Sequence, residues 1–230
     1  MYEDIIGNYL NVKKKIKVLE NQSPFNYPVA LLAVSKGHSV AKINSIFNQG
    51  HLDFAESYVQ ELQNKQKELS HLPINWHYIG RIQSNKCKYL AQNTYWVHSL
   101  DRFNIAEKLD NNFIPSRLSK LNVCIQLNFY GKESQSGVFL EDVHNLALYV
   151  DSLSNLNLRG IMCILDNNSD IVNLKLDMNS IYSAFLDIKR SVASDSFDVL
   201  SMGMSSDMEP AILSGSNMVR VGSSIFGSRV

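Results

Sequence analysis

The apolar run VALLAV at residues 29–34, followed directly by Ser35 and Lys36, is the stretch that decides the fold. Six consecutive apolar residues are typical of a strand that is buried on both faces, and Pro28 ends the element before it. Upstream, residues 5–19 place apolar side chains at spacings of three and four. This spacing predicts an amphipathic helix that packs against the main body of the protein.

Further short strand-like segments alternate with amphipathic segments along the chain. They lie at 52–55, 75–79, 96–99, 122–127, 158–162, 199–201 and 218–221. Together with the first, they make eight strands, which leaves a choice between an open doubly wound sheet and a closed barrel. The count favours the barrel, so we expect an α/β fold: a single (β/α)8 TIM-type barrel with an extra N-terminal helix. No repeat or low-complexity tract divides the sequence, and we predict one domain over residues 1–230.

Composition narrows the class of protein. The chain has 22 basic and 22 acidic residues in 230, and 45% of its residues are hydrophobic. This balance is typical of a compact domain without the basic field that attracts nucleic acid. The apolar runs are far shorter than the roughly 20 residues of a membrane span, and we expect neither a membrane partner nor a signal peptide.

Cysteine and histidine usage bears on location and metals. The three cysteines are widely spaced without a Cys-x-x-Cys pair, which fits a reducing compartment and predicts a cytoplasmic protein. The six histidines are scattered, and we predict no metal site. His77, alone on a predicted strand, is interpreted as a hydrogen-bonded barrel residue.

Lys36 is the first candidate for chemistry. It follows the first predicted strand directly, and the C-terminal ends of barrel strands are where active sites form. A buried ammonium is costly unless it is paired or loses its charge, and an amine with a lowered pKa can form a Schiff base with an aldehyde. The alternative is a lysine that leaves the strand for solvent, and position alone favours that alternative.

Two stretches of small residues change this balance. SMGMSSD at 201–207 follows the seventh predicted strand, and GSS at 222–224 follows Arg220 in the eighth. Each could be an ordinary turn or helix cap. However, the loops after the last two strands are the common phosphate site of barrels, because backbone N–H groups at helix starts bind anions. A lysine beside a phosphate site suggests pyridoxal 5'-phosphate (PLP).

Four motifs in chain order resemble the pyridoxal phosphate homeostasis protein family, also called the proline synthase co-transcribed family. They are LLAVSK at 31–36, FAESYVQE at 54–61, WHYIGRIQSNK at 76–86 and SMGMSSDME at 201–209. The resemblance runs from the first helix to the end of the chain. It implies a barrel similar to the N-terminal domain of alanine racemase, with PLP held as an internal aldimine on Lys36.

The resemblance also implies further cofactor-binding residues. Arg220 would face the pyridine nitrogen and, because arginine stays protonated, would weaken the ring as an electron sink. Pocket-lining side chains are implied at Ser57 and Asn85. The phosphate cradle is implied at Ser201, Gly203, Gly222, Ser223 and Ser224, with Ser205 as a weaker candidate.

The chain departs from the family at several positions. Gly37 and His38 stand where Thr and Pro are usual, Ala55 and Ser57 where Gly and Asn are usual, and Gln135 where a second lysine is common. The sequence leaves two roles open for Glu56, which either neutralises Lys36 or caps a helix.

Three functions are consistent with these features. The favoured one is a PLP-binding protein without substrate turnover that serves intracellular vitamin B6 homeostasis and passes PLP transiently to apo-enzymes. A racemase-like PLP enzyme is the first alternative. It needs a second base, which alanine racemases take from a further domain that a chain ending at Val230 is expected to lack. The second alternative is a barrel that has lost PLP and acts as an interaction module. We expect a monomer.

Overall fold

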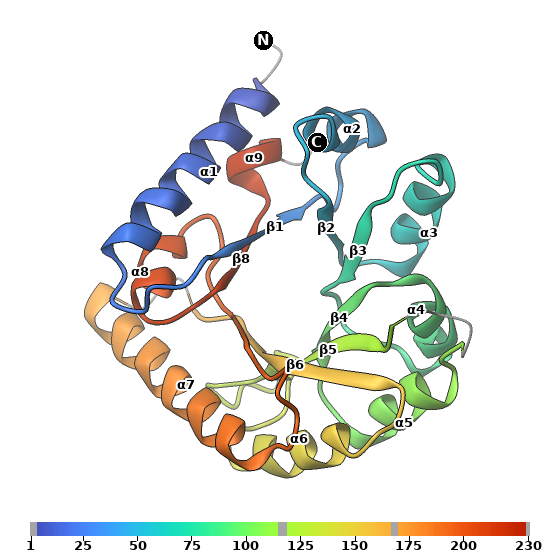
Figure 1. The fold of residues 1–230 in the computed structure, drawn as a ribbon, viewed down its shortest axis with the longest axis vertical. Coiled ribbons are helices and arrows are strands. Elements are labelled where there is room, and N and C mark those ends of the chain that lie inside the picture. The colour runs from blue at the N-terminus through green and yellow to red at the C-terminus, as the bar shows by residue number, and fades with distance from the viewer. Residues whose placement is uncertain (1–3, 115–118, 167–169, 229–230) are drawn as a thin grey trace.

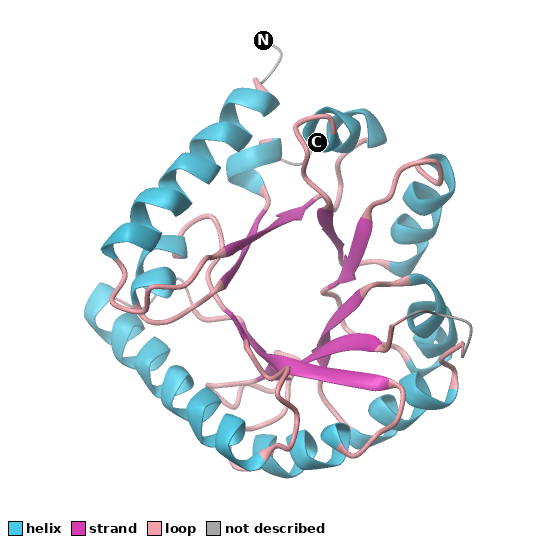
Figure 2. Cartoon of the chain, in the orientation of Figure 1, coloured by secondary structure: helices cyan, strands magenta, loops and turns pink. Residues whose placement is uncertain are grey.

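The chain folds into a closed barrel of eight parallel strands with helices around it (Figure 1). The computed structural model describes residues 4–114, 119–166 and 170–228. The strands are β1 (Ala30–Val34), β2 (Asp53–Glu56), β3 (Asn75–Tyr78), β4 (Trp96–Leu100), β5 (Leu121–Leu127), β6 (Leu156–Cys163), β7 (Val199–Ser201) and β8 (Met218–Val221). In Figure 2 the strands form a ring enclosed by the helices. The predicted (β/α)8 architecture and all eight predicted strands are confirmed.

Helices follow the strands and cover the outside of the ring. They are α2 (Val40–Phe47), α3 (Val59–Glu68), α4 (Cys87–Asn93), α5 (Phe103–Asn111), α6 (Val143–Asp151), α7 (Ile171–Ser191), α8 (Met208–Leu213) and α9 (Ser223–Phe226), with a 3-10 turn η1 (Ser84–Lys86) before α4. Their apolar sides and the outward faces of the strands form the main core. The βα pattern of the sequence therefore places every connecting loop at one of the two ends of the barrel.

The N-terminal helix α1 (Ile5–Gln22) is the expected addition to the eight-unit plan. The Asp4 side chain caps it by accepting the Gly7 N–H at 2.8 Å. Its buried residues are Tyr9, Val12, Ile16 and Leu19, the stripe that the spacing predicts. Figure 1 shows α1 lying along the outside of the barrel beside α8 and α9.

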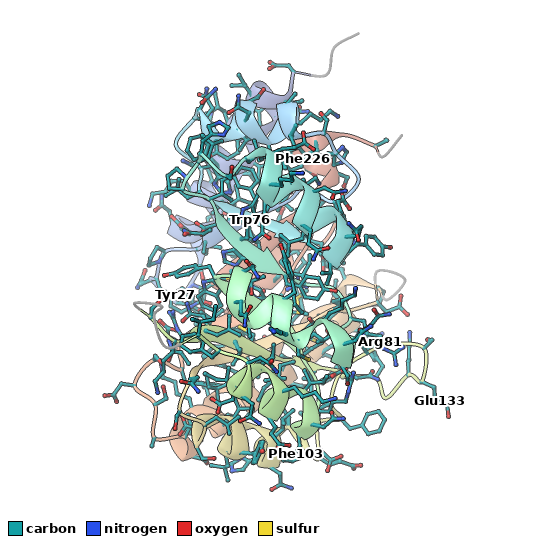
Figure 3. All side chains as sticks on the ribbon, turned by 90° about the vertical axis from the view of Figure 1, so that its right-hand side faces the viewer. Tyr27, Trp76, Arg81, Phe103, Glu133 and Phe226 are labelled. Carbon is teal, nitrogen blue, oxygen red and sulfur yellow. The ribbon has the colours of Figure 1, made fainter. Side chains whose placement is uncertain are left out.

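Closure of the ring depends on β8 pairing with β1. In this register Leu32 lies opposite Arg220 and Ala33 opposite Val221. The C-terminal ends of the first and last strands therefore adjoin at the same end of the barrel. In the side view, Arg81 and Glu133, from the loops after β3 and β5, lie on the side opposite Tyr27, which precedes β1 (Figure 3).

Two further features bear on the class of protein. No helix in the described ranges is long and apolar enough to cross a membrane. Cys87, Cys124 and Cys163 are all buried, and none forms a disulfide.

Candidate cofactor site

A cavity of about 530 Å³ opens at the C-terminal end of the barrel. This volume lies within the range of small-molecule sites, roughly 300 to 1,000 Å³. Strand residues and loops that follow six of the strands line it. The lining consists of Val34, Lys36, His38, Ser57, Ile79, Met162, Ile164, Met204, Ser205, Ser206, Arg220, Gly222, Ser223, Gly227 and Ser228.

Lys36 lies in a tight turn at the end of β1. The His38 N–H donates to the Ser35 carbonyl at 3.0 Å, and Gly37 between them has a φ of +75°. A positive φ at the third position of a β-turn favours glycine because a Cβ would be strained there. The half-buried Lys36 is thus held at the second position of a glycine-dependent turn, where it lines the cavity.

Arg220 lines the same cavity from β8 and is 4% exposed. One terminal nitrogen donates to the carbonyl and the hydroxyl of Ser201, both at 2.8 Å, and the other donates to the Cys163 carbonyl at 2.8 Å. Burial lowers the pKa of Arg220, but an arginine begins so far above neutral pH that it stays charged. The site therefore has a fixed cation whose orientation is set by three hydrogen bonds.

Small residues from the loops after β7 and β8 form one wall. Ser205 and Ser206 come from the first loop, and Gly222 and Ser223 from the second. The Ser224 N–H donates to the Ser205 hydroxyl at 3.3 Å, which ties the two loops together. This is the wall at which the sequence predicts a phosphate site.

Four predicted site residues do not line the cavity. Asn85 lies exposed in η1, and Ser224 is exposed next to the lining residue Ser223. Ser201 is fully buried and contacts Arg220 instead. Gly203 packs against α8, where an added Cβ would lie 2.6 Å from the Ala211 Cβ. Lys36, Ser57, Arg220, Gly222 and Ser223 are brought together.

His38 is the main lining residue that the sequence did not predict as a site residue. It is 9% exposed and stacks on the Phe226 ring, with the centroids 5.2 Å apart. Its place two residues after Lys36 was the available signal, but only the turn directs it toward the cavity.

The structure gives Glu56 a partner that the sequence did not predict. The carboxylate is fully buried and pairs with Lys65 of α3, with the Lys65 Nζ 2.7 Å from Oε1. The Ser35 hydroxyl donates to the same oxygen at 2.6 Å. Burial raises the pKa of Glu56, and the charge and hydrogen bonds of Lys65 offset only part of that rise.

The buried His77 and His98 form a chain of polar groups with the partly exposed Asp53. The Nε2 of His77 lies 3.2 Å from Asp53, and its Nδ1 lies 2.9 Å from the Nε2 of His98. Because the Asp53 carboxylate only accepts, His77 donates from Nε2, and His98 must then donate to the His77 Nδ1. In the described part of the chain, the buried Nδ1 of His98 has no hydrogen-bond partner. Burial lowers the pKa of His77. Burial also lowers the pKa of His98, and electrostatic interactions with His77 and Arg220 add to the effect, so that it lies well below its ordinary range.

The groups at the cavity match the chemistry of PLP. A lysine amine fits an aldehyde, a fixed guanidinium fits the lone pair of a ring nitrogen, and hydroxyls beside small residues fit a phosphate. Val34, Ile79, Met162 and Ile164 add apolar lining for a flat aromatic ring. The residues present therefore fit this cofactor.

Comparisons with known proteins agree with this chemistry. Residues 8–230 match the family model of the alanine racemase N-terminal domain. A pyridoxal phosphate homeostasis protein of Pseudomonas aeruginosa is 43% identical over 201 residues, covering 87% of this chain and 85% of the relative. The protein of the same name from Escherichia coli K12 is 38% identical over 232 residues, covering 98% and 97%.

Solved structures show the same relationship. PipY of Synechococcus elongatus with PLP bound has a TM-score of 0.84 and 28% identity, covering 97% of this chain and all of PipY. Alanine racemase of Corynebacterium glutamicum has a TM-score of 0.71 at 14% identity. The match covers 98% of this chain but only 61% of the racemase, and it shows a shared fold.

The buried histidines predict an acid-sensitive stability. Because the folded state holds His77 and His98 at lowered pKa values, the unfolded chain binds more protons below the ordinary histidine pKa of about 6.5. Their contribution is complete above that pH and is lost as the pH falls toward 5, at up to about 1.4 kcal/mol per pH unit for each histidine. Denaturant unfolding measures the free energy of unfolding at each pH. Between pH 7.5 and 5 this free energy should fall less steeply with decreasing pH in His98→Gln than in the wild type. His71→Gln, at an exposed site, is the control and should keep the wild-type slope; an unchanged slope in His98→Gln would contradict the argument.

Proposed function

Because the chain belongs to the pyridoxal phosphate homeostasis protein family, we propose that it binds PLP in the cavity at the C-terminal end of its barrel and serves intracellular PLP homeostasis. The observation that carries this proposal is the meeting of Lys36, Arg220 and the small-residue wall in one cavity. The relatives named for this role, and the PLP-bound structure of PipY, support the same assignment.

Lys36 is the residue that holds the cofactor covalently in this proposal. PLP supplies an aldehyde that reacts reversibly with primary amines, and sequestering such a reactive compound has a plain use in a cell. Lys36 is the lining residue with a primary amine, at the end of β1.

The remaining residues orient the cofactor without reacting. Arg220 faces the ring nitrogen, and Ser201 acts through Arg220 by fixing its guanidinium. Ser223 and Gly222 receive the phosphate, with Ser205 added from the facing loop. Ser57 lines the cavity from the end of β2 with a shorter reach than an asparagine.

We propose that this site holds PLP without turning over a substrate. A guanidinium at the ring nitrogen keeps that nitrogen unprotonated, which disfavours carbanion chemistry. We further propose a cytoplasmic monomer of one domain, with apo-enzymes as transient partners and no nucleic-acid partner. A racemase would need a second base at the cavity, and His38 is the lining residue that such an activity would have to use.

Substitution of Lys36 tests the site directly. Lys36→Ala should abolish the visible absorption of bound PLP, because the amine is lost. It should also prevent borohydride from fixing a pyridoxyl group to the peptide that contains residue 36. Mass analysis of the reduced, digested protein makes the measurement, with Lys88→Ala, at an exposed position after β3, as the control. Borohydride-reducible PLP surviving in Lys36→Ala would overturn the assignment.

Arg220→Gln should alter the spectrum of bound PLP while leaving the cofactor attached. A neutral amide replaces the fixed cation at the ring nitrogen, so the absorption maximum should move and the affinity should fall by about 10- to 100-fold. Titration of the PLP-free protein with PLP measures both effects. Arg81→Gln, in the exposed loop after β3, is the matched control, and identical spectra for the two variants would contradict the role of Arg220.

Amino acids should not be converted by the PLP-loaded protein. Incubation with D- or L-alanine should leave the enantiomer unchanged by chiral chromatography, because a guanidinium at the ring nitrogen disfavours carbanion chemistry. Racemisation that disappears in His38→Gln would establish the enzyme instead.

A further inference from the structure

The turn that carries Lys36 is held from outside by two side chains of α3. The Lys65 Nζ donates to the Ser35 carbonyl at 2.7 Å, and the Gly37 N–H donates to the Glu61 Oε1 at 2.6 Å. These are the carbonyl of the peptide before Lys36 and the N–H of the peptide after it. Both peptide groups that flank Lys36 are therefore fixed by the same helix.

Lys65 and Glu61 are themselves joined. Their charged groups lie 2.7 Å apart, one helical turn from each other on α3. The side chain of Lys65 is 6% exposed and that of Glu61 is 25% exposed. Partial burial raises the pKa of Glu61, but hydrogen bonds from Lys65 and Gly37 outweigh it, and the pKa is lowered overall. Glu61 is therefore ionised throughout the neutral range.

Glu56 completes the cluster from the end of β2. Its Oε1 accepts from both Lys65 and the Ser35 hydroxyl, whereas its Oε2 is buried and has no hydrogen-bond partner among the described residues. A buried ion pair is weak evidence for stability, since well-packed apolar residues often serve as well. A buried charged cluster costs free energy, and this one contacts the backbone on both sides of Lys36. A need to hold Lys36 in position explains the cluster better than stability does.

We propose that Glu61 and Lys65, anchored by Glu56, are positioning residues that fix the Lys36 turn so that its amine meets the PLP aldehyde. This inference rests on the function proposed above. A lysine side chain is flexible, so a fixed backbone at its base limits the positions that the amine can reach. Misplacement by about 1 Å can slow a reaction of oriented groups by about 100-fold.

Glu61 offers the sharpest test because it is the most exposed member of the cluster. Glu61→Ala removes the acceptor of the Gly37 N–H, and Glu61→Gln retains an acceptor oxygen but loses the charge. Both variants lose the ion pair with Lys65, so a merely structural role would affect them alike. Glu68→Ala, at an exposed carboxylate farther along α3, is the control.

Two measurements on the PLP-free protein separate the outcomes. Hydrogen exchange of the peptide around Gly37 should quicken in Glu61→Ala and stay slow in Glu61→Gln. Stopped-flow absorbance should show the rate of PLP attachment falling by about 10- to 100-fold in Glu61→Ala and remaining near the wild-type rate in Glu61→Gln. Lys65→Met, if it folds, should behave like Glu61→Ala.

An attachment rate in Glu61→Ala equal to that of the Glu68→Ala control would overturn the positioning role. Equal rates in Glu61→Ala and Glu61→Gln, both below the control, would also overturn it, because they would trace the effect to lost charge. If the wild type attaches no PLP at Lys36, the proposed function fails instead. The exchange measurement needs no cofactor and still decides whether Glu61 holds the turn.

Discussion

The pairing of β8 with β1 is the contact on which the site depends. It places Leu32 opposite Arg220, so that the first and last strands are neighbours in the closed ring. Because all the strands run parallel, the loop after β1 then faces the loops after β7 and β8. Lys36 and the serine-rich loops, which are remote in the sequence, meet in one cavity as a result. Without closure the amine and the guanidinium would lie on opposite edges of an open sheet.

The protein buries charged side chains next to this site. Arg220 is held by Ser201 and Cys163, and the Glu56–Lys65 pair is enclosed between β2 and α3. Each group would be expensive to bury alone, and each has its charge or hydrogen bonds answered by specific partners. In the proposed site, Arg220 would orient the ring nitrogen of the ligand. Lys65, which pairs with Glu56, donates to the Ser35 carbonyl at the base of the Lys36 turn. Fixed geometry is what such buried polar groups provide.

The residues that depart from the family pattern are accommodated by the structure, and the cavity keeps the groups that match PLP. Gly37 adopts the positive φ that its turn requires, and His38 covers the cavity edge by stacking on Phe226. Ala55 packs in a small cluster with Leu32 and Val34 below the cavity. The amine, the guanidinium and the small-residue loops therefore meet in one cavity in the presence of these substitutions. This is the physical reason for preferring a PLP holder to a barrel that has lost its ligand.

The sequence by itself determined the eight strands, the N-terminal helix and Lys36 as the candidate amine, because hydrophobic periodicity and strand ends are local properties. It also placed Arg220 and the small residues after the last two strands. It could not predict that Ser201 turns from the cavity toward Arg220, or that Asn85 stays outside. Nor could it pair Glu56 with Lys65, because the two residues lie nine positions apart on different elements, β2 and α3. Those decisions depend on which way each side chain points once the barrel closes, and only the tertiary structure fixes that direction.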